Sequence, residues 1–486
     1  MRTDRRVLTI LSGVLALSYA YFYQAGGWNQ NSRFALVRAV LERHTLQIDA
    51  YQLHTGDRAL WNGHYYSDKA PGLSLAALPP AAVARIAARV AGVDPEGFPG
   101  LAWTSYLATV VTAGLFTVLA AVAVFVVTRR WGYSPGAALF AAIAFGIGGP
   151  AWCYATLFMG HGMTAGCLSA SLAVVLLLDQ ADTRRQRDVA VALGLMLGWS
   201  VVTEFQAAIP AIVIAGLALA RMRRGSREDV TAFIWRLLAA GAACGLVLLV
   251  YNALAFGNPL HLGYQSEEHF EELKRGFFGI TSPEWWRIRE LLVGRYRGLL
   301  PLFPLAGIAP VGLLVAARDP QRRATALAAL SIALYYLVLN ASYHYWEGGW
   351  AYGPRQIMSA MPFVALGLGP LWDFRSTWWR GLLVVAFAWG VALTVVAEAT
   401  NPQPPAQIKS PVSELLWPAF RDADFSLNTQ TMVHATPPGG PRPRPEVPRA
   451  AWNLGEIAGL RGYASLAPLG AVWLAAGGLL WTARKR

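Results

Sequence analysis

One short stretch near the start of the chain gathers side chains that could perform acid–base chemistry on an anionic substrate. It holds three carboxylates, Asp49, Asp57 and Asp68, together with His64 and Lys69. A carboxylate can accept the proton of an attacking hydroxyl, and an ammonium can stabilise a departing phosphate. A solvated loop would carry a similar density of charge, so the pattern leaves a purely structural interpretation open.

Two arginines stand where an anion could bind at the mouth of an apolar run. Arg355 follows Gly353 and Pro354 directly before one run, and Arg297 precedes another. An arginine in this position either snorkels toward lipid headgroups or binds an anion. The glycines and aromatic residues before Arg355 favour a fixed guanidinium and therefore the anion site.

Other polar side chains lie at the ends of apolar runs. His161 and Glu204 occupy turns between such runs, where an ionisable group is either functional or a cap of the turn. We expect one cavity to be lined by His64, Tyr65, His161, Glu204, Tyr264 and His344. A carboxylate pair could hold a divalent ion, but no metal-ligand spacing is present and we expect no metal.

These residues need a scaffold, and the composition indicates a membrane-embedded one. The 486 residues are 55% apolar and 14% charged, which leaves too little polar surface to enclose a soluble core. Runs long enough to cross ~30 Å of hydrocarbon predict about twelve membrane helices. They cover residues 7–23, 101–128, 135–153, 160–179, 189–204, 205–220, 231–256, 300–317, 323–341, 355–372, 380–398 and 465–483.

Short basic loops indicate how these helices are oriented. The net charge is +13, but the arginines fall between apolar runs and form no stripe of the kind that nucleic-acid binding requires. Their clusters lie at 129–130, 184–187, 221–227, 318–323, 375–380 and 484–486. Short positive loops stay in the cytoplasm, so we expect both termini there. An uncleaved first helix is preferred over a signal peptide, because many further spans follow it.

Residues 72–92 decide the topology of everything that follows them. The segment is apolar, but Pro79, Pro80, Arg85 and Arg89 interrupt it. If it crossed the membrane, every short basic loop would face outward, against the usual bias. We therefore interpret it as a juxtamembrane helix.

The outer loops are then expected to hold the chemistry on one face of the membrane. In the first of them, residues 33–41 predict an interfacial helix with a cap at 28–32, although a plain amphipathic spacer would look the same. The outer loops are 24–100, 257–299, 342–354 and 399–464. The expected divisions of the chain are a transmembrane catalytic domain (1–398), a proline-rich outer loop (399–464), and a last helix with a basic tail (465–486).

At these residues the sequence resembles bacterial members of the GT-C superfamily of polytopic glycosyltransferases. The likeness is to the family that contains protein O-mannosyltransferases and the lipid A aminoarabinose transferase. Asp68-Lys69-Ala70-Pro71-Gly72 is similar to a Lys-Pro-Pro element of that family, and Gly353-Pro354-Arg355 to a recurring Gly-Pro-Arg. The resemblance implies an all-α polytopic fold with juxtamembrane helices in the first outer loop. It also implies a bacterial inner membrane and an extracytoplasmic active site.

The activity implied by the resemblance is that of an inverting glycosyltransferase without a cofactor. It would move a sugar from a polyprenyl phosphate to an envelope lipid, glycan or protein. The base would be Asp57 or Asp49, with Asp68 as a third candidate. The phosphate ligands would be Lys69 and Arg355, with Arg297 as a weaker third.

The chain departs from the family directly after its first span. There Asn29-Gln30-Asn31 stand in place of an acidic pair, and an amide cannot act as a base. Two other classes of protein therefore stay open. One is a flippase for a lipid-linked glycan, although the polar residues lie at the outer edge and not at the bilayer midplane. The other is a non-catalytic scaffold of an envelope-synthesis complex.

Overall fold

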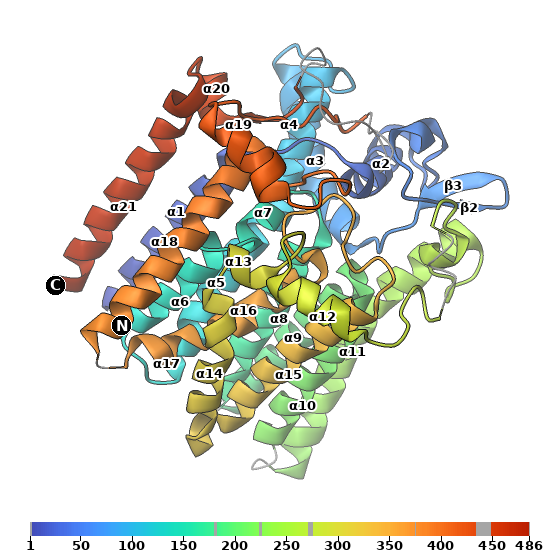
Figure 1. Cartoon of the computed structure of the whole chain (residues 1–486). Helices are drawn as coiled ribbons and strands as arrows, with labels where there is room; N and C mark the ends of the chain where they lie inside the picture. Colours follow the sequence, from blue (N-terminus) through green and yellow to red (C-terminus); the bar gives the residue numbers. More distant parts are fainter. Residues whose placement is uncertain are drawn as a thin grey trace.

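The computed structural model describes residues 2–178, 182–222, 226–270, 276–374, 376–433 and 449–485. Four arginines of the basic clusters, Arg223, Arg224, Arg375 and Arg486, lie outside these ranges. Within them the chain is a helical bundle with two pairs of short strands (Figure 1). The expected all-α polytopic class is confirmed.

The helices follow the apolar runs closely. Those of the first half are α1 (Arg2–Ala20), α2 (Trp28–Arg43), α3 (Gly72–Val90), α4 (Phe98–Thr109), α5 (Leu115–Arg130), α6 (Pro135–Ile147), α7 (Ala151–Ala155), α8 (Gly160–Val175), α9 (Thr183–Thr203), α10 (Ala208–Met222) and α11 (Arg227–Phe256). Those of the second half are α12 (Trp285–Val293), α13 (Leu299–Leu302), α14 (Leu305–Ala317), α15 (Pro320–Ser342), α16 (Met361–Ala365), α17 (Leu368–Trp372), α18 (Thr377–Thr400), α19 (Trp417–Arg421), α20 (Leu454–Ile457) and α21 (Ala467–Lys485).

Proline and glycine break several of the expected spans into shorter helices. The run 135–153 is split into α6 and α7 around Pro150, and the run 300–317 is split into α13 and α14 at Pro304. The run 355–372 becomes the short turn η7 (Arg355–Ala360) followed by α16 and α17. A proline lacks the N–H group that continues a helix, which accounts for such breaks.

Length and hydropathy alone identify seven helical stretches in the described residues that could cross a membrane. Six of them coincide with expected spans, and the seventh is α3. Composition therefore does not separate α3 from a spanning helix. Its packing partners favour the predicted juxtamembrane position.

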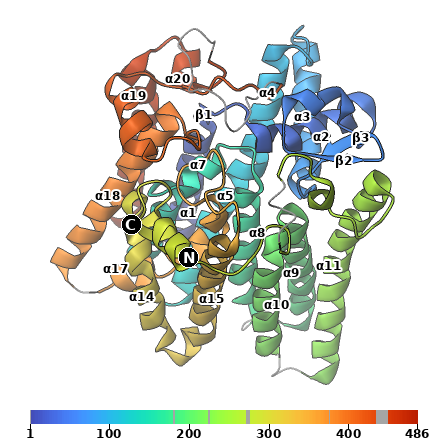
Figure 2. The same ribbon diagram turned by 45° about the vertical axis from the view of Figure 1, so that its right-hand side comes forward.

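Helix α3 packs along α2 and against α4, at one end of the bundle (Figures 1 and 2). Its start meets the start of α2, where the Ser74 hydroxyl donates to the Arg33 carbonyl at 2.9 Å. Its end meets the end of α2, where Arg85 pairs with Glu42 at 2.6 Å.

The continuous helix Phe98–Arg130 has 33 residues. At 1.5 Å per residue it is about 50 Å long, well beyond the ~30 Å of a bilayer core. Its α4 part can therefore project from the membrane together with α3, as the juxtamembrane interpretation requires.

Helix α2 differs from the expected surface helix in two respects. It begins at Trp28, so the predicted cap at 28–32 is wrong and those residues form its first turns. Residues 30–39 are all buried, so the helix lies inside the protein and is not an amphipathic spacer. A charged side chain in this helix is consequently forced into the interior, where it needs a partner.

The two strand pairs close the same end of the molecule, called the outer end below. Strands β2 (Arg58–Trp61) and β3 (His64–Ser67) form an antiparallel hairpin. Strand β1 (Phe22–Tyr23), directly after α1, pairs with β4 (Trp452–Asn453), directly before α20. In Figure 1, α1 runs toward this end and α21 runs away from it, so both chain termini lie away from the hairpin.

Candidate functional site

Lys69 lies between two of the three predicted aspartates. Its Nζ atom is 2.8 Å from Asp57 Oδ2 and 2.6 Å from Asp68 Oδ2. The Lys69 side chain is 10% exposed, and that of Asp68 is fully buried. The hairpin β2–β3 makes this arrangement, because Asp57 precedes β2 and Asp68 follows β3. Because the two strands are antiparallel, the start and the end of the hairpin lie next to each other. The two aspartates therefore lie on either side of the Lys69 ammonium.

The charges of this trio are set by burial and mutual attraction. Burial alone would lower the pKa of Lys69, but the carboxylates of Asp57 and Asp68 outweigh it and hold the pKa above its ordinary value. Burial raises the pKa of Asp68, while Lys69 pulls it in the opposite direction. The Lys69 ammonium therefore keeps its proton.

A second ion pair lies beside the trio. Arg33 of α2 donates from one terminal nitrogen to Glu204 Oε1 at 2.9 Å and from the other to the carbonyl of Ala70 at 3.1 Å. Its Nε donates to Asn29 Oδ1 at 3.2 Å. Arg33 is 2% exposed and Glu204 is 8% exposed. The pair joins the turn after α9 to the residue that follows Lys69.

Two tyrosines connect these ion pairs to Arg355. Lys69 Nζ lies 5.6 Å from the centre of the Tyr264 ring, and the charges of Glu204 and Arg33 also act on the Tyr264 hydroxyl. Lys69 and Arg355 both lie close enough to the hydroxyl of Tyr343 for their charges to act on it. Residues 33, 57, 68, 69, 204 and 355 are called the outer cluster below.

Arg355 differs from the other cations of the outer cluster in having no counter-charge. In the described part of the chain its guanidinium has no ion pair, and its Nε is buried without a hydrogen-bond partner. A side chain at Gly348 would approach the Arg355 Cβ to 3.2 Å, so the glycine-rich loop closes over the arginine. A half-buried, unpaired guanidinium held in this way is suited to receive an anion.

Arg297 has a different environment from Arg355. It is fully buried, and its terminal nitrogens donate to the carbonyls of Gly349 and Ala351 and to the Tyr296 hydroxyl at 3.1 Å. It therefore shapes the glycine-rich loop that precedes Arg355. Its predicted role as a phosphate ligand would require it to release these partners.

His161 lies near the outer cluster, in the first turn of α8. Arg355 and Arg33 are both close enough for their charges to act on its imidazole. Its ring meets Tyr154 edge to face at 5.6 Å, and its Nδ1 has no hydrogen-bond partner among the described residues.

Three of the residues predicted for the cavity or for catalysis, Asp49, His64 and Tyr65, make their contacts at the hairpin and not within the outer cluster. Asp49 pairs with His64 Nδ1 at 2.7 Å at the tip of the hairpin, where the two side chains are 40% and 48% exposed. Its other oxygen accepts the Tyr65 backbone N–H at 2.6 Å, and the Tyr65 ring stacks on Arg58. His344 meets Tyr345 edge to face in the loop after α15. The hairpin moves Asp49 and His64 away from Lys69, although they are close to it in sequence.

Glu267 is a buried carboxylate near Lys69 that the sequence did not single out. Its oxygens accept the backbone N–H groups of His269 and Phe270, at 2.9 and 2.5 Å. Burial raises the pKa of Glu267 to about 7, and Asp68 adds to this while the two N–H groups oppose it. Arg33 was also not predicted as a site residue, because its only signal was a charge in a largely apolar helical stretch.

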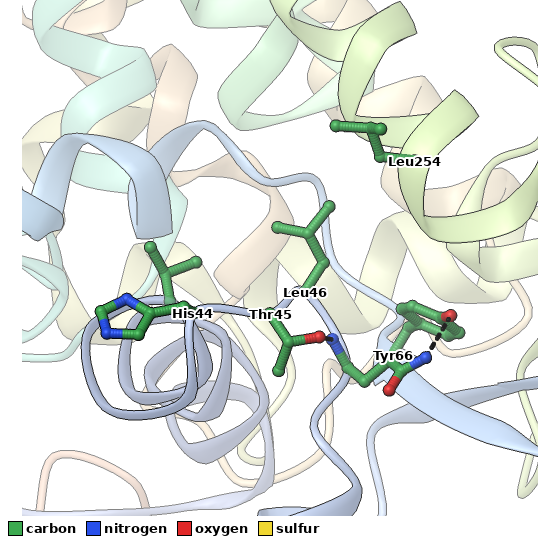
Figure 3. A pocket seen from close by; sticks show the side chains of 7 residues that line it. His44, Thr45, Leu46, Tyr66 and Leu254 are labelled. Carbon is green, nitrogen blue, oxygen red and sulfur yellow. Dashed lines mark hydrogen bonds between the residues drawn. The ribbon is translucent and has the colours of Figure 1, made fainter.

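A groove of about 480 Å³ opens between α2, β3 and α11 (Figure 3). Its walls are Val40, His44, Thr45, Leu46, Gln47, Tyr66 and Leu254. None of the six residues expected to line a cavity is among them. With no Lys, Arg, Asp or Glu in its walls, the groove offers little to an anionic reaction.

Buried amides tie the C-terminal part of the chain to the segment that follows α1. Gln30 Nε2 donates to Gln403 Oε1 at 2.6 Å, and Gln403 Nε2 donates to the Gly26 carbonyl at 2.8 Å. Asn428 Nδ2 donates to the carbonyls of Gln24 and Gly26, at 2.8 and 3.0 Å. The buried amides of Gln30, Gln403 and Asn428 are called the amide clamp below. Their hydrogen bonds are to one another and to backbone carbonyls, so their role in this arrangement is structural.

No group of three or more His, Cys, Asp or Glu side chains in the described residues is placed to hold a metal ion. Between Asp57 and Asp68 the position that a cation would take is filled by the Lys69 ammonium.

The arrangement of helices is that of the GT-C glycosyltransferases, and the chain has a GT-C-like fold. The structure of ArnT from Cupriavidus metallidurans bound to undecaprenyl phosphate is similar over 98% of this chain and 75% of that one. Its TM-score is 0.54 at 17% identity. The archaeal oligosaccharyltransferase AglB from Archaeoglobus fulgidus, in complex with an inhibitory peptide and a dolichol-phosphate, is similar over 91% of this chain and 61% of that one. Its TM-score is 0.52 at 15% identity.

No family model matches the sequence, and no curated protein sequence is similar to it. The structural similarity establishes the fold. At an identity this low it does not establish the activity, which has to be argued from the site.

Proposed function

We propose that this protein is an inverting glycosyltransferase that uses a polyprenyl-phosphate sugar at the extracytoplasmic face of a bacterial inner membrane. The observation that carries the proposal is the guanidinium of Arg355, without an ion pair in the described residues, which lies with the Lys69 ammonium near the Tyr343 hydroxyl at one end of a GT-C-like bundle. A lipid phosphate is an anion delivered at the membrane surface, and these two cations can meet it there.

In this proposal the cations stabilise the leaving group. The acceptor oxygen forms a bond to the anomeric carbon, the bond from that carbon to the phosphate oxygen breaks, and the electron pair stays on the polyprenyl phosphate. Negative charge therefore grows on the phosphate as the bond lengthens, and fixed donors lower the barrier at that place. Arg355 can bind two phosphate oxygens at once, and Lys69 acts as a point charge.

The aspartates around Lys69 serve as its counter-charges. An ammonium has three N–H donors, and Asp57 and Asp68 take two of them. The third is free for a phosphate oxygen, so the donor can bind without displacing either carboxylate. Asp68 is fully buried, and Asp49 lies at the hairpin tip, so neither is placed well to act as a base.

The test is turnover by purified protein in lipid nanodiscs. Polyprenyl phosphates carrying different radiolabelled sugars would be offered with lipid, glycan and peptide acceptors extracted from a bacterial envelope. Release of free polyprenyl phosphate together with labelled acceptor supports the proposal. R355A and K69A variants should each lower turnover by about 10²-fold or more.

Two outcomes of this experiment support other classes of protein. Movement of the labelled lipid across a vesicle membrane without product supports a flippase. Absence of both movement and product for every donor, from protein that is folded by its thermal transition, supports a scaffold.

A further inference from the structure

We infer that Glu204, held by Arg33, is the carboxylate that accepts the proton of the acceptor hydroxyl. This rests on the proposed function and assigns the one role that the proposal leaves open. The inference comes from where the carboxylates lie relative to Lys69.

An inverting displacement places the attacking oxygen and the leaving phosphate on opposite faces of the sugar. The base must lie on the attacking side, within hydrogen-bond reach of the hydroxyl. Asp57 and Asp68 both contact the Lys69 ammonium directly. If Lys69 binds the phosphate, these two carboxylates belong to the leaving-group side.

Glu204 makes no ion pair with Lys69 in the described residues, but both groups lie near Tyr264. The Lys69 ammonium lies 5.6 Å from the centre of the Tyr264 ring, and the Glu204 charge acts on the hydroxyl of the same residue. The segments that carry the two groups are in tight contact, because a Cβ at Gly72 would come within 2.7 Å of the Thr203 backbone nitrogen. A sugar bound by its phosphate at Lys69 can therefore reach toward Glu204.

The surroundings hold the Glu204 carboxylate in one place. Arg33 binds its Oε1 at 2.9 Å. The same oxygen lies against the first residue of α8, where a Cβ on Gly160 would approach it to 2.2 Å. The Glu204 carboxylate is thus held between the Arg33 guanidinium and the amino end of α8. Within the described residues Oε1 alone carries a hydrogen bond, which leaves Oε2 for the acceptor hydroxyl.

Other side chains nearby fit the role less well. His161 would become a cation on taking a proton, and the charges of Arg355 and Arg33 already act on its ring. Asn29 shares the Arg33 guanidinium with Glu204, but an amide is not a base. The proton therefore passes from the acceptor oxygen to Glu204 Oε2 as that oxygen bonds to the anomeric carbon.

The deciding experiment compares the E204Q and D57N variants with the wild type in nanodiscs. We expect E204Q to lower kcat by about 10²–10⁴-fold, the usual contribution of a general base. Its affinity for polyprenyl phosphate, measured by equilibrium binding, should stay within about threefold of wild type. D57N removes a negative charge beside Lys69, so it should mainly strengthen that affinity. Glu414 is exposed and distant in the fold, so E414Q is the matched control and should behave as wild type.

Loss of folding is separated from loss of the base by two further variants. R33Q/E204Q removes both charges of the pair, so it leaves no buried arginine without a partner; it should bind polyprenyl phosphate and still lack turnover. E204D keeps a carboxylate and should recover part of kcat. The inference is wrong if E204Q turns over like wild type, or if D57N alone abolishes kcat while binding is unchanged. A wild-type protein that transfers no sugar would instead overturn the proposed function.

Discussion

At the scale of single residues, Glu267 makes the charge around Lys69 depend on pH. The pKa of its carboxyl, raised by burial from 4.5 to about 7, lies near neutral pH. In the folded chain the group is neutral at pH 6 and charged at pH 8, whereas in the unfolded chain it is charged at both. Its contribution to the free energy of unfolding is therefore fully present below about pH 4.5 and is lost as the pH rises through about 7.

The same titration should change the affinity for an anionic lipid. Between pH 6 and pH 8 Glu267 adds one negative charge near Asp68 and Lys69, so we expect the Kd for undecaprenyl phosphate to rise by roughly a few-fold. The E267Q variant should lose this part of the pH dependence. The titration of the lipid phosphate itself is common to both proteins and cancels in the comparison. The prediction is wrong if the Kd of E267Q changes with pH as much as the Kd of wild type does. The E268Q variant, at the neighbouring residue, is the control.

The paired Lys69 and the unpaired Arg355 should differ in their contributions to stability. K69A leaves two buried carboxylates without a counter-charge, which destabilises the fold by about 3–5 kcal/mol. R355A removes a cation without an ion pair in the described chain and should lower stability by about 1 kcal/mol or less. Thermal unfolding in detergent measures both. Combining K69A with D57N and D68N should recover much of the loss, and failure to do so would indicate that packing causes it.

At the scale of elements, buried ion pairs fix α3 to α2. Glu42 accepts from Arg85 at 2.6 Å, from Arg38 at 3.0 Å and from the Tyr51 hydroxyl at 2.7 Å. A spanning α3 would have to carry Arg85 through the bilayer, away from these partners. The Arg85–Glu42 pair between the two helices therefore favours the juxtamembrane prediction, although the composition of α3 is compatible with crossing.

Cysteine labelling tests the position of α3. Leu53 precedes α3 and Ala91 follows it, and both are exposed. We expect L53C and A91C to react with the same membrane-impermeant maleimide applied to the outside of spheroplasts. R184C, at the start of α9, should be protected until the membrane is opened. The three native cysteines are buried and give little background. Labelling of residues 53 and 91 from opposite sides would show that α3 crosses the membrane.

The apolar runs predicted the helices well, because hydrophobic length is a local property of the sequence. The outer cluster was predictable only in part. Lys69 and Asp57 stood out by density of charge, whereas Arg33 resembled an ordinary charge on a helix surface. Asp49 was misplaced because the Asn-Gly turn at 62–63, a strong hairpin signal, was not used to fold the loop back. Which charges meet depends on tertiary packing that no local pattern records.

At the scale of the whole molecule, the amide clamp joins the start of the chain to its last fifth. Asn428 supplies hydrogen bonds to two buried carbonyls, those of Gln24 and Gly26. N428L removes one of the two donors of each carbonyl, because Gln403 Nε2 also donates to both. It should lower the free energy of unfolding by about 1 kcal/mol for each lost hydrogen bond. Thermal unfolding in detergent measures the loss, with Q321L at an exposed amide as control. An unchanged transition would mean that other contacts hold the two regions together.

The pairing of β1 with β4 has a consequence for biosynthesis. Phe22 leaves the ribosome early but pairs with Asn453, so its partner is made only when the chain is almost finished. At about 5–20 residues per second, that interval is on the order of tens of seconds. A nascent chain held in the membrane thus lacks the last strand of its outer end until synthesis is nearly over. The assembled site should appear only in chains that have been translated almost to completion.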